Sequence, residues 1–115
     1  MISSEPNVGD IWLAYVAFAD IPSVGKVRPA LILSLGNTDD GVVAAKITAS
    51  ANWDESEYLP IPNWEACGLR KPSFIQLSPL FAINRAQLLR AEPIGRISQD
   101  LLRLAIDRAN QGSTE

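Results

Sequence analysis

The sequence is dominated by short apolar runs that are rich in aromatic and β-branched residues and are separated by segments containing glycine, proline, asparagine or aspartate. The first run spans residues 11–18 (IWLAYVAF), and the next spans residues 27–34 (VRPALILS). Runs of this length without helix caps are typical of strands. A third run at residues 42–48 follows the polar segment 36–41 (GNTDDG), which predicts a hairpin between the second and third strands.

Shorter strands are predicted in the second half of the chain. Residues 58–61 are limited by a proline, residues 73–77 alternate polar and apolar side chains, and residues 93–97 form a last short strand. Residues 62–72 are interpreted as a long connection and residues 84–90 as a short helical turn.

Only the C-terminal segment has a clear helical pattern. Apolar residues recur there at helical spacing, which predicts a helix over residues 98–110. The Ser98 hydroxyl can accept a hydrogen bond from a first-turn N–H, Asp100 suits the positive end of the helix dipole, and Gly112 lies just past the predicted end. Several short strands and one terminal helix predict a mainly β fold, a small, strongly bent SH3-like barrel or sheet with the helix packed on it.

The length and composition bound the class of protein. A chain of 115 residues allows one domain, expected over residues 1–115 with its core at about 8–110. Apolar residues make up 47% of the chain, which argues against disorder, yet no run is long enough to cross a bilayer. The N-terminus lacks the features of a secretory signal, and the single cysteine, Cys67, fits a reducing compartment. We therefore expect a cytoplasmic protein without a membrane partner.

The absence of histidine removes a large block of chemistry. It excludes the Ser-His-Asp triad, histidine-dependent ribonucleases and the usual zinc site. Cys67 has no histidine to activate it, so we do not expect it to act as a nucleophile. The acidic clusters at residues 39–40 and 54–57 lack the glycine placement of a calcium loop and are interpreted as solvated turns. Neither a metal nor another cofactor is expected.

Charge is distributed unevenly along the chain. Residues 1–65 carry 3 basic and 9 acidic side chains, a net charge of −6, whereas residues 66–115 carry 7 basic and 4 acidic side chains, a net charge of +3. Nucleic-acid binding depends on clustered cations that displace counterions from phosphates. An acidic chain of this kind could therefore bind nucleic acid only through a local basic surface, and a solvated mixed surface is the simpler interpretation.

Five short blocks of sequence, taken together in their order and spacing, are a more specific family signature than any one of them alone. The blocks are GDI at residues 9–11, KVRPALILS at 26–34, AAKIT at 44–48, GLRKPS at 68–73 and IGRIS at 94–98. Together they resemble the PemK/MazF family, the toxins of bacterial type II toxin–antitoxin pairs. The blocks extend over nearly the whole chain.

The resemblance implies both an architecture and an activity. It implies an SH3-like barrel with a C-terminal helix, a homodimer, and a cognate antitoxin protein as partner. It also implies sequence-specific, metal-independent cleavage of single-stranded RNA. In that reaction the ribose 2′-OH attacks the adjacent phosphorus and leaves a 2′,3′-cyclic phosphate and a 5′-OH. Such chemistry suits a protein without histidine, because the nucleophile belongs to the substrate.

Two residues match the catalytic positions of the family. Arg28 precedes the proline of the second strand, and a guanidinium can bind two phosphate oxygens at once. Its high pKa makes charge stabilisation its first expected role and proton transfer only a secondary one. Thr48 ends the third strand, and its hydroxyl can donate to a phosphoryl oxygen or orient the 2′-OH. A hairpin through residues 36–41 would bring both to the same end of adjacent strands. The alternatives are a strand-edge arginine and a packing threonine.

Six further residues are candidates for binding substrate. Lys26 could share a face with Arg28, although a solvated loop lysine is an equally good interpretation. Gln76 and Ser78 are polar positions of the 73–78 strand that could contact bases. Arg70, Lys71 and Arg85 are cations that could form a basic surface along which RNA binds. Simple solvent exposure is the alternative for all of them. Trp12 is expected in the core, whereas Trp53 lies in a polar loop and could stack on a base.

Other functions are compatible with the same fold. The chain could be a non-catalytic barrel, either a nucleic-acid-binding module or a toxin that poisons another target such as DNA gyrase. It could also be a structural adaptor in which the matched residues serve folding alone. Arg28 and Thr48 discriminate between these functions, because a nuclease needs both side chains to converge on one accessible phosphate.

Overall fold

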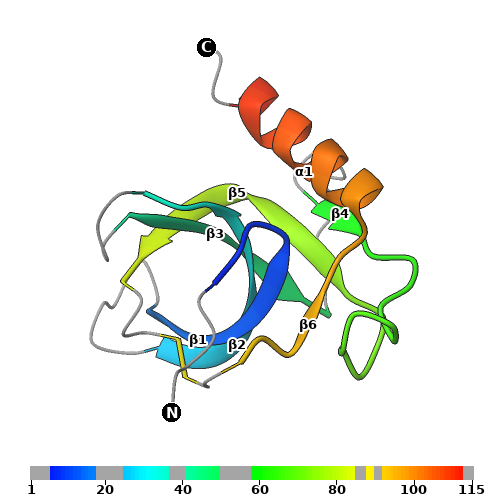
Figure 1. Ribbon diagram of the computed structural model, residues 1–115, viewed down its shortest axis with the longest axis horizontal. Coiled ribbons are helices and arrows are strands. Elements are labelled where there is room, and N and C mark those ends of the chain that lie inside the picture. The colour runs from blue at the N-terminus through cyan, green and yellow to red at the C-terminus, as the bar shows by residue number, and fades with distance from the viewer. Residues whose placement is uncertain are drawn as a thin grey trace.

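The computed structural model describes residues 6–17, 25–36, 41–49, 58–84, 88–89 and 92–112. The elements in chain order are β1 (Asp10–Ala17), β2 (Gly25–Ser34), β3 (Val42–Thr48), β4 (Tyr58–Pro60), β5 (Phe74–Ile83), β6 (Gly95–Arg96) and α1 (Gln99–Gly112). The strands form one sheet in the order β4-β5-β3-β2-β1-β6, and every neighbouring pair is antiparallel. The sheet curls strongly on itself, and the helix lies at one end of it (Figure 1). The predicted mainly β, barrel-like fold with a C-terminal helix is confirmed.

The curled sheet buries apolar side chains on both of its faces, as alternation along β2 shows. Leu31 and Leu33 belong to a larger cluster that includes Ile11, Ile47 and Ile75 and is extended by the helix. A second cluster lies on the opposite face and contains Trp12, Ala14, Ala30, Ile32, Val42, Ala44 and Ile83. Trp12 is only 2% exposed, so its predicted core position is confirmed. A strand buried on both faces explains why VRPALILS reads as an almost continuous apolar run.

The C-terminal helix is capped at its N-terminus by Ser98, as the sequence predicts, but it extends through Gly112, which the sequence places just past its end. The backbone N–H of Leu101 donates to Ser98 Oγ at 3.2 Å, and the N–H of Leu102 donates to the Ser98 carbonyl at 2.9 Å. Leu101 and Ala105 are buried in the larger cluster, one helical turn apart. The helix is therefore anchored on the sheet through one face. No helix in the described part of the chain is long and apolar enough to cross a membrane.

Strand β5 is longer than predicted. It continues past residue 77 to Ile83, although it contains Pro79. The β3–β5 register shifts between Ala44 and Lys46, because Ala44 pairs with Phe81 while Lys46 pairs with Gln76. Pro79 thus lies in a bulge, where the ladder does not require its missing N–H. A proline normally ends a strand, which is why the sequence pattern stops too early.

The helical turn predicted at residues 84–90 is wrong at the three positions that the structure describes, residues 84, 88 and 89, none of which is helical. Leu88 forms a bridge with Ala14, and the N–H of Leu89 donates to the Leu13 carbonyl at 2.9 Å. Residues 85–87 and 90 lie outside the described residues. The open edge of β1 supplies hydrogen-bond partners here, and this long-range pairing replaces the local helical bonds that the sequence favours.

Candidate functional site

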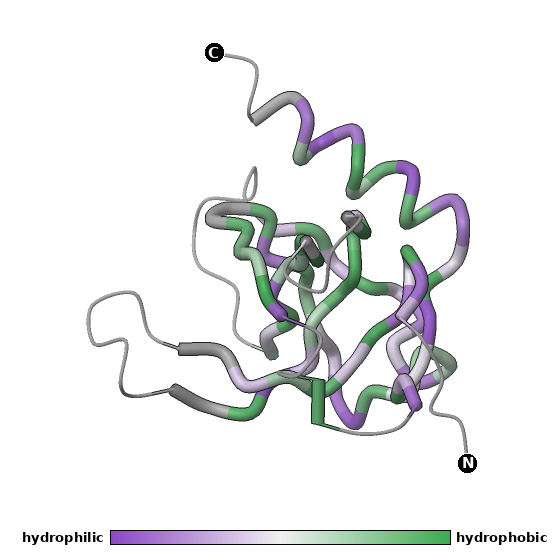
Figure 2. Tube along the Cα trace, turned by 60° about the vertical axis from the view of Figure 1, so that its left-hand side comes forward, coloured by the Kyte–Doolittle hydropathy of each residue, from purple (hydrophilic) through white to green (hydrophobic). Residues whose placement is uncertain are grey.

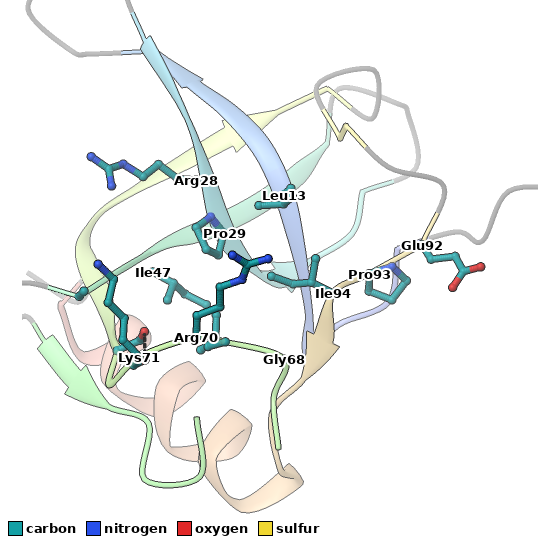
Figure 3. Close-up of a pocket in the computed structure, with 13 residues that line it drawn as sticks. Leu13, Arg28, Pro29, Ile47, Gly68, Arg70, Lys71, Glu92, Pro93 and Ile94 are labelled. Carbon is teal, nitrogen blue, oxygen red and sulfur yellow. Dashed lines mark hydrogen bonds between the residues drawn. The ribbon is translucent and has the colours of Figure 1, made fainter. Parts of the chain in front are cut away.

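A pocket of about 860 Å³ opens beside the β1–β2 pair, where two connecting segments approach it (Figure 3). One segment, residues 68–73, follows the turn before β5, and the other, residues 92–94, precedes β6. Its volume falls in the range of small-ligand sites. The residues that line it are Leu13, Arg28, Pro29, Ile47, Ala49, Gly68, Leu69, Arg70, Lys71, Ser73, Glu92, Pro93 and Ile94.

The wall of the pocket is mostly apolar. Leu13 and Pro29 are directly paired across β1 and β2, so their side chains share one face of that ribbon. Ile47 is buried beneath the pocket, and Ile94 packs against the larger core cluster. A flat apolar group can therefore pack against this wall, because proline and aliphatic side chains have no hydrogen-bonding groups that would be left without partners.

Three cations surround this apolar wall. Figure 3 shows the Arg70 side chain reaching over the middle of the pocket toward Leu13 and Ile94, with Arg28 and Lys71 on one side. Arg70 and Lys71 are exposed, and Arg28 is half-buried. Among the described residues, none of these three side chains has an ion pair or hydrogen bond. The described lining thus carries three cations and one carboxylate, an excess of positive charge that an anion such as a phosphate would neutralise.

The pocket's two connecting segments are held together by a glycine–glycine crossing. Gly68 has φ +85°, in the left-handed region that favours glycine. A Cβ on Gly68 would collide with the carbonyl of Ile94, and one on Gly95 would collide with the carbonyl of Cys67. The crossing therefore leaves no room for any side chain at either position. It sets where the GLRKPS block, which carries Arg70 and Lys71, meets the IGRIS block.

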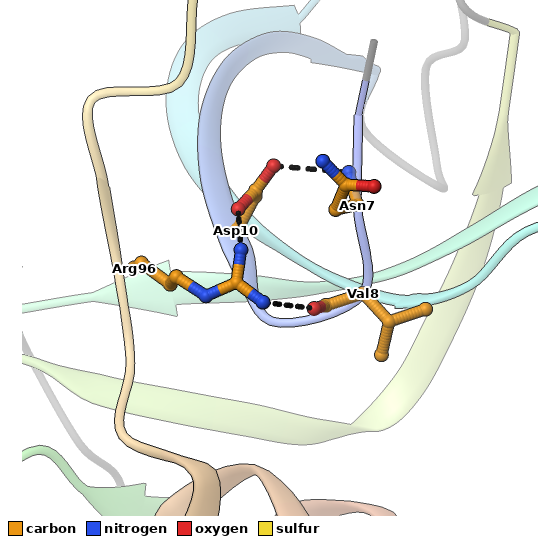
Figure 4. Close-up of polar contacts among 4 residues, drawn as sticks. All are labelled: Asn7, Val8, Asp10 and Arg96. Carbon is orange, nitrogen blue, oxygen red and sulfur yellow. Dashed lines mark hydrogen bonds and ion pairs between the residues drawn. The ribbon is translucent and has the colours of Figure 1, made fainter.

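An ion pair ties the start of β1 to β6 (Figure 4). Arg96 Nη1 lies 2.8 Å from Asp10 Oδ1, and the other carboxylate oxygen accepts from the Asn7 N–H at 2.9 Å. Arg96 Nη2 also donates to the Val8 carbonyl at 3.4 Å. The Asp10 carboxylate is buried, with a side-chain exposure of 5%, and thus needs these donors. The pairing explains why the GDI and IGRIS blocks both carry a charged residue.

The strand register brings the two predicted catalytic residues to the same end of β2 and β3. Ala30 pairs with Lys46, so continuing the antiparallel register by two residues places Arg28 opposite Thr48. Arg28 lines the pocket, as do the two chain neighbours of Thr48, Ile47 and Ala49. Thr48 itself is half-buried and lies outside the lining. The placement agrees with the hairpin argument, and the catalytic roles stay a prediction.

The six predicted substrate-binding residues are divided by the structure. Arg70 and Lys71 line the pocket with Arg28. Gln76 is half-buried and pairs with Lys46 and Tyr58 in the sheet, outside the lining. Lys26 pairs with Val16 in the β1–β2 ladder, and Ser78 lies in the β5 bulge. The side chains of Lys26 and Ser78, and all of Arg85 and Trp53, lie outside the described residues.

Sequence reasoning missed most of the apolar wall and the one acidic group at the pocket. Leu13, Pro93 and Ile94 read as ordinary strand residues, because periodicity does not tell which strand ends remain uncovered. Glu92 lines the rim, with its carboxylate pointing away from the pocket in Figure 3. The available signal was the GLRKPS and IGRIS pair of blocks, whose glycines require close backbone contact.

No metal or thiol chemistry is favoured by the described residues. They contain no group of three or more cysteine, aspartate or glutamate side chains that could hold a metal ion. The acidic residues 39–40 and 54–57 lie outside the described residues. Burial raises the pKa of the Cys67 thiol, which lowers the share of nucleophilic thiolate at neutral pH. This agrees with the prediction that Cys67 is not a nucleophile.

Comparisons with known proteins place the fold. The toxin MazF-mt6 of Mycobacterium tuberculosis superposes with a TM-score of 0.68 at 24% sequence identity, over 90% of this chain and 93% of that one. An endoribonuclease from mycobacterial species superposes with a TM-score of 0.65 at 15% identity, over 95% of this chain and 90% of that one. A search of curated protein sequences found no match. A family model for the PemK-like, MazF-like toxin of type II toxin–antitoxin systems matches residues 7–110, and the chain therefore belongs to that family.

Proposed function

We propose that this chain is the toxin of a type II toxin–antitoxin pair and that it acts as an endoribonuclease on single-stranded RNA. The observation that supports the proposal most directly is the pocket, in which Arg28, Arg70 and Lys71 surround an apolar wall without partners among the described residues. Phosphates would bind the cations and a base would rest on the wall. The family match and the likeness to a solved endoribonuclease agree with this assignment.

The proposed reaction uses a nucleophile of the substrate. The ribose 2′-oxygen forms a bond to the adjacent phosphorus as its proton leaves. The bond from phosphorus to the 5′-oxygen breaks, and that oxygen takes up a proton. Arg28 would stabilise the negative charge that builds on the phosphoryl oxygens, and the Thr48 hydroxyl would donate to one of these oxygens or orient the 2′-OH. The products are a 2′,3′-cyclic phosphate and a 5′-OH, and no step requires a metal.

The acidic composition does not oppose this function. The chain carries a net charge of −3, but the pocket lining contains three cations and one carboxylate. Association with a polyanion depends on the local arrangement of charge, because contacts beyond a Debye length are largely screened. The remaining negative charge would discourage binding of RNA elsewhere on the surface, which favours productive binding at the pocket.

The proposal includes the partners expected for such a toxin. We propose a cytoplasmic homodimer of single-domain chains that is held inactive by a cognate antitoxin protein. The family of toxin–antitoxin proteins supports an antitoxin partner. Co-expression with the neighbouring open reading frame, followed by purification of the complex, would test this part separately.

The decisive experiment is cleavage of a long, mixed-sequence single-stranded RNA by the purified protein in the presence of EDTA. We expect wild-type cleavage with 2′,3′-cyclic phosphate and 5′-OH ends. Arg28→Ala should lower the cleavage rate by at least about 100-fold, the usual loss when a charge-stabilising donor is removed. Thr48→Val, which keeps the shape but removes the hydroxyl, should give a smaller loss. Arg103→Ala is a matched control, because Arg103 is an exposed arginine on α1 outside the pocket.

Two outcomes would contradict the proposal in different ways. Full activity of Arg28→Ala would contradict the proposed role of Arg28 in charge stabilisation, although the protein would still be an endoribonuclease. Absence of cleavage by a folded wild-type protein would favour the non-catalytic alternatives, a nucleic-acid-binding module or a toxin that poisons a target such as DNA gyrase. A gyrase supercoiling assay on the same preparation separates those two alternatives.

A further inference from the structure

An exposed apolar pair lies on the β1–β2 ribbon next to the pocket. Tyr15 and Val27 are directly paired across the two strands, so their side chains share one face. Tyr15 is 39% exposed and Val27 is 53% exposed. Their joint exposure marks a surface that some ligand can cover.

This pair continues the apolar wall of the pocket. Leu13 and Pro29 form the neighbouring pair on the same face of the ribbon, two residues along each strand, and both line the pocket. Two residues along a strand span about 7 Å. Arg28 lies between Val27 and Pro29 in the chain and also lines the pocket, while the alternation of side chains along β2 turns it to the opposite face of the ribbon from the exposed pair. The surface is thus one apolar stripe that starts inside the pocket and runs outward.

The apolar stripe runs along the β1–β2 ribbon, away from the pocket. Figure 2 shows β1 and β2 extending side by side away from the body of the curled sheet. The described residues contain two other large exposed apolar side chains, Leu89 and Leu104. Leu104 lies on α1, outside the pocket lining. Among these exposed side chains, Tyr15 carries an aromatic ring and lies two residues from Leu13, which lines the pocket.

We propose that Tyr15, supported by Val27, is a stacking platform for the nucleobase next to the one held in the pocket. The inference rests on the proposed function, because it assumes that a single-stranded RNA binds with a phosphate at Arg28. A strand that leaves the pocket along the ribbon brings its next base over this pair. Aromatic rings bind unpaired bases of any sequence through their faces, and Val27 supplies adjoining apolar surface on the same face.

The charge of the pocket favours a nucleic acid over a protein as the occupant. The inner end of the stripe, Leu13 and Pro29, lines the pocket together with three cations, so a ligand lying along the stripe meets cations at the pocket and apolar surface on the ribbon. This arrangement suits a single strand that places a phosphate at the cations and its next base on the apolar pair. The platform therefore extends the binding site from one nucleotide to at least two.

The test measures binding of short RNA oligonucleotides that cannot be cleaved. The wild-type cleavage site is first mapped on a long RNA. Oligonucleotides centred on that site then carry a 2′-deoxy residue at the scissile nucleotide and one abasic residue, placed at each flanking position in turn. We expect one flanking abasic position to weaken wild-type binding about tenfold, as loss of a stacked base does.

Variants at the platform separate stacking from other effects. Tyr15→Leu should bind the intact oligonucleotide about tenfold more weakly and lose its sensitivity to that abasic position. Tyr15→Phe, which keeps the ring, should behave as wild type. Leu104→Ala removes an equally exposed apolar side chain elsewhere and should change nothing. Circular dichroism confirms that each variant is folded.

Three results would overturn the inference. Wild-type affinity and wild-type abasic sensitivity in Tyr15→Leu would show that the ring does not stack, while cleavage that depends on Arg28 would leave the proposed function intact. A change in self-association or antitoxin binding by Tyr15→Leu, without a change in RNA binding, would assign the pair to a protein interface. Failure of the wild-type protein to bind or cleave RNA would overturn the proposed function, and the platform with it.

Discussion

At the scale of single residues, the two partners of the Asp10–Arg96 ion pair differ in their environment. The Asp10 side chain is 5% exposed, whereas the Arg96 side chain is 56% exposed. A guanidinium that loses its partner can be solvated by water, but a buried carboxylate cannot. The pair is therefore more sensitive to loss of the arginine than to loss of the acid.

We predict that Arg96→Met lowers the free energy of unfolding by about 2 kcal/mol, because it leaves the Asp10 carboxylate buried with only the Asn7 N–H. Asp10→Asn should cost less, about 1 kcal/mol, because the amide oxygen still accepts that hydrogen bond and no buried charge remains. Urea denaturation of both variants measures the difference. A larger loss in Asp10→Asn than in Arg96→Met would contradict this order, and Arg103→Met controls for removal of an exposed arginine.

At the scale of elements, the helix depends on its first turn. Leu101 and Ala105 anchor the helix in the larger core cluster. They can be buried together only if the residue at which the helix starts turns both side chains toward the sheet. The Ser98 hydroxyl secures that start by accepting from the Leu101 N–H. A cap of this kind determines the orientation of the whole element as well as its local stability.

We predict that Ser98→Ala lowers the free energy of unfolding by about 1 kcal/mol, the usual effect of removing an N-cap oxygen. Ser98→Asp, which restores an acceptor at the positive end of the helix dipole, should keep or exceed wild-type stability. Thermal unfolding followed by circular dichroism distinguishes them. Equal midpoints for the alanine and aspartate variants would mean that the hydroxyl contributes nothing to the helix.

The elements also show where prediction from the sequence succeeds. Strands β1, β2 and β3 and the helix follow from local pattern, because their apolar residues and caps act over a few neighbouring residues. The continuation of β5 through Pro79 and the bridge from Leu88 to Ala14 do not, because both depend on a strand that is distant in sequence. The motif and the hairpin topology predict the position of Arg28 at the end of β2. They do not predict that Leu13 and Ile94 line a pocket, because their exposure depends on how far the sheet curls.

At the scale of the whole molecule, an acidic chain places three cations that have no ion pair among the described residues together at one pocket. The net charge is −3, and three cations line that single site. Binding of a polyanion should therefore involve few phosphates and depend only moderately on salt. A protein with a wide basic surface would show a much steeper dependence.

We predict that log Kd for an uncleavable single-stranded RNA rises linearly with log salt concentration, with a slope that reflects about three phosphates at about 0.7 each. Lys71→Ala and Arg70→Ala should each weaken binding and reduce the slope by about one phosphate. Arg103→Ala should leave the slope unchanged. A slope that stays at the wild-type value in both pocket variants would place the phosphates elsewhere.

The sheet order carries a consequence for how the protein is made. Among the described residues, the outer edge of β1 is paired by residues 88–89 and 94–96, and residues 92–94 form one wall of the pocket. During synthesis that edge stays unpaired until residues 94–96 have left the ribosome, and an unpaired edge invites aggregation. Chains that terminate before residue 92 therefore lack one wall of the pocket as well as the partners that protect this edge.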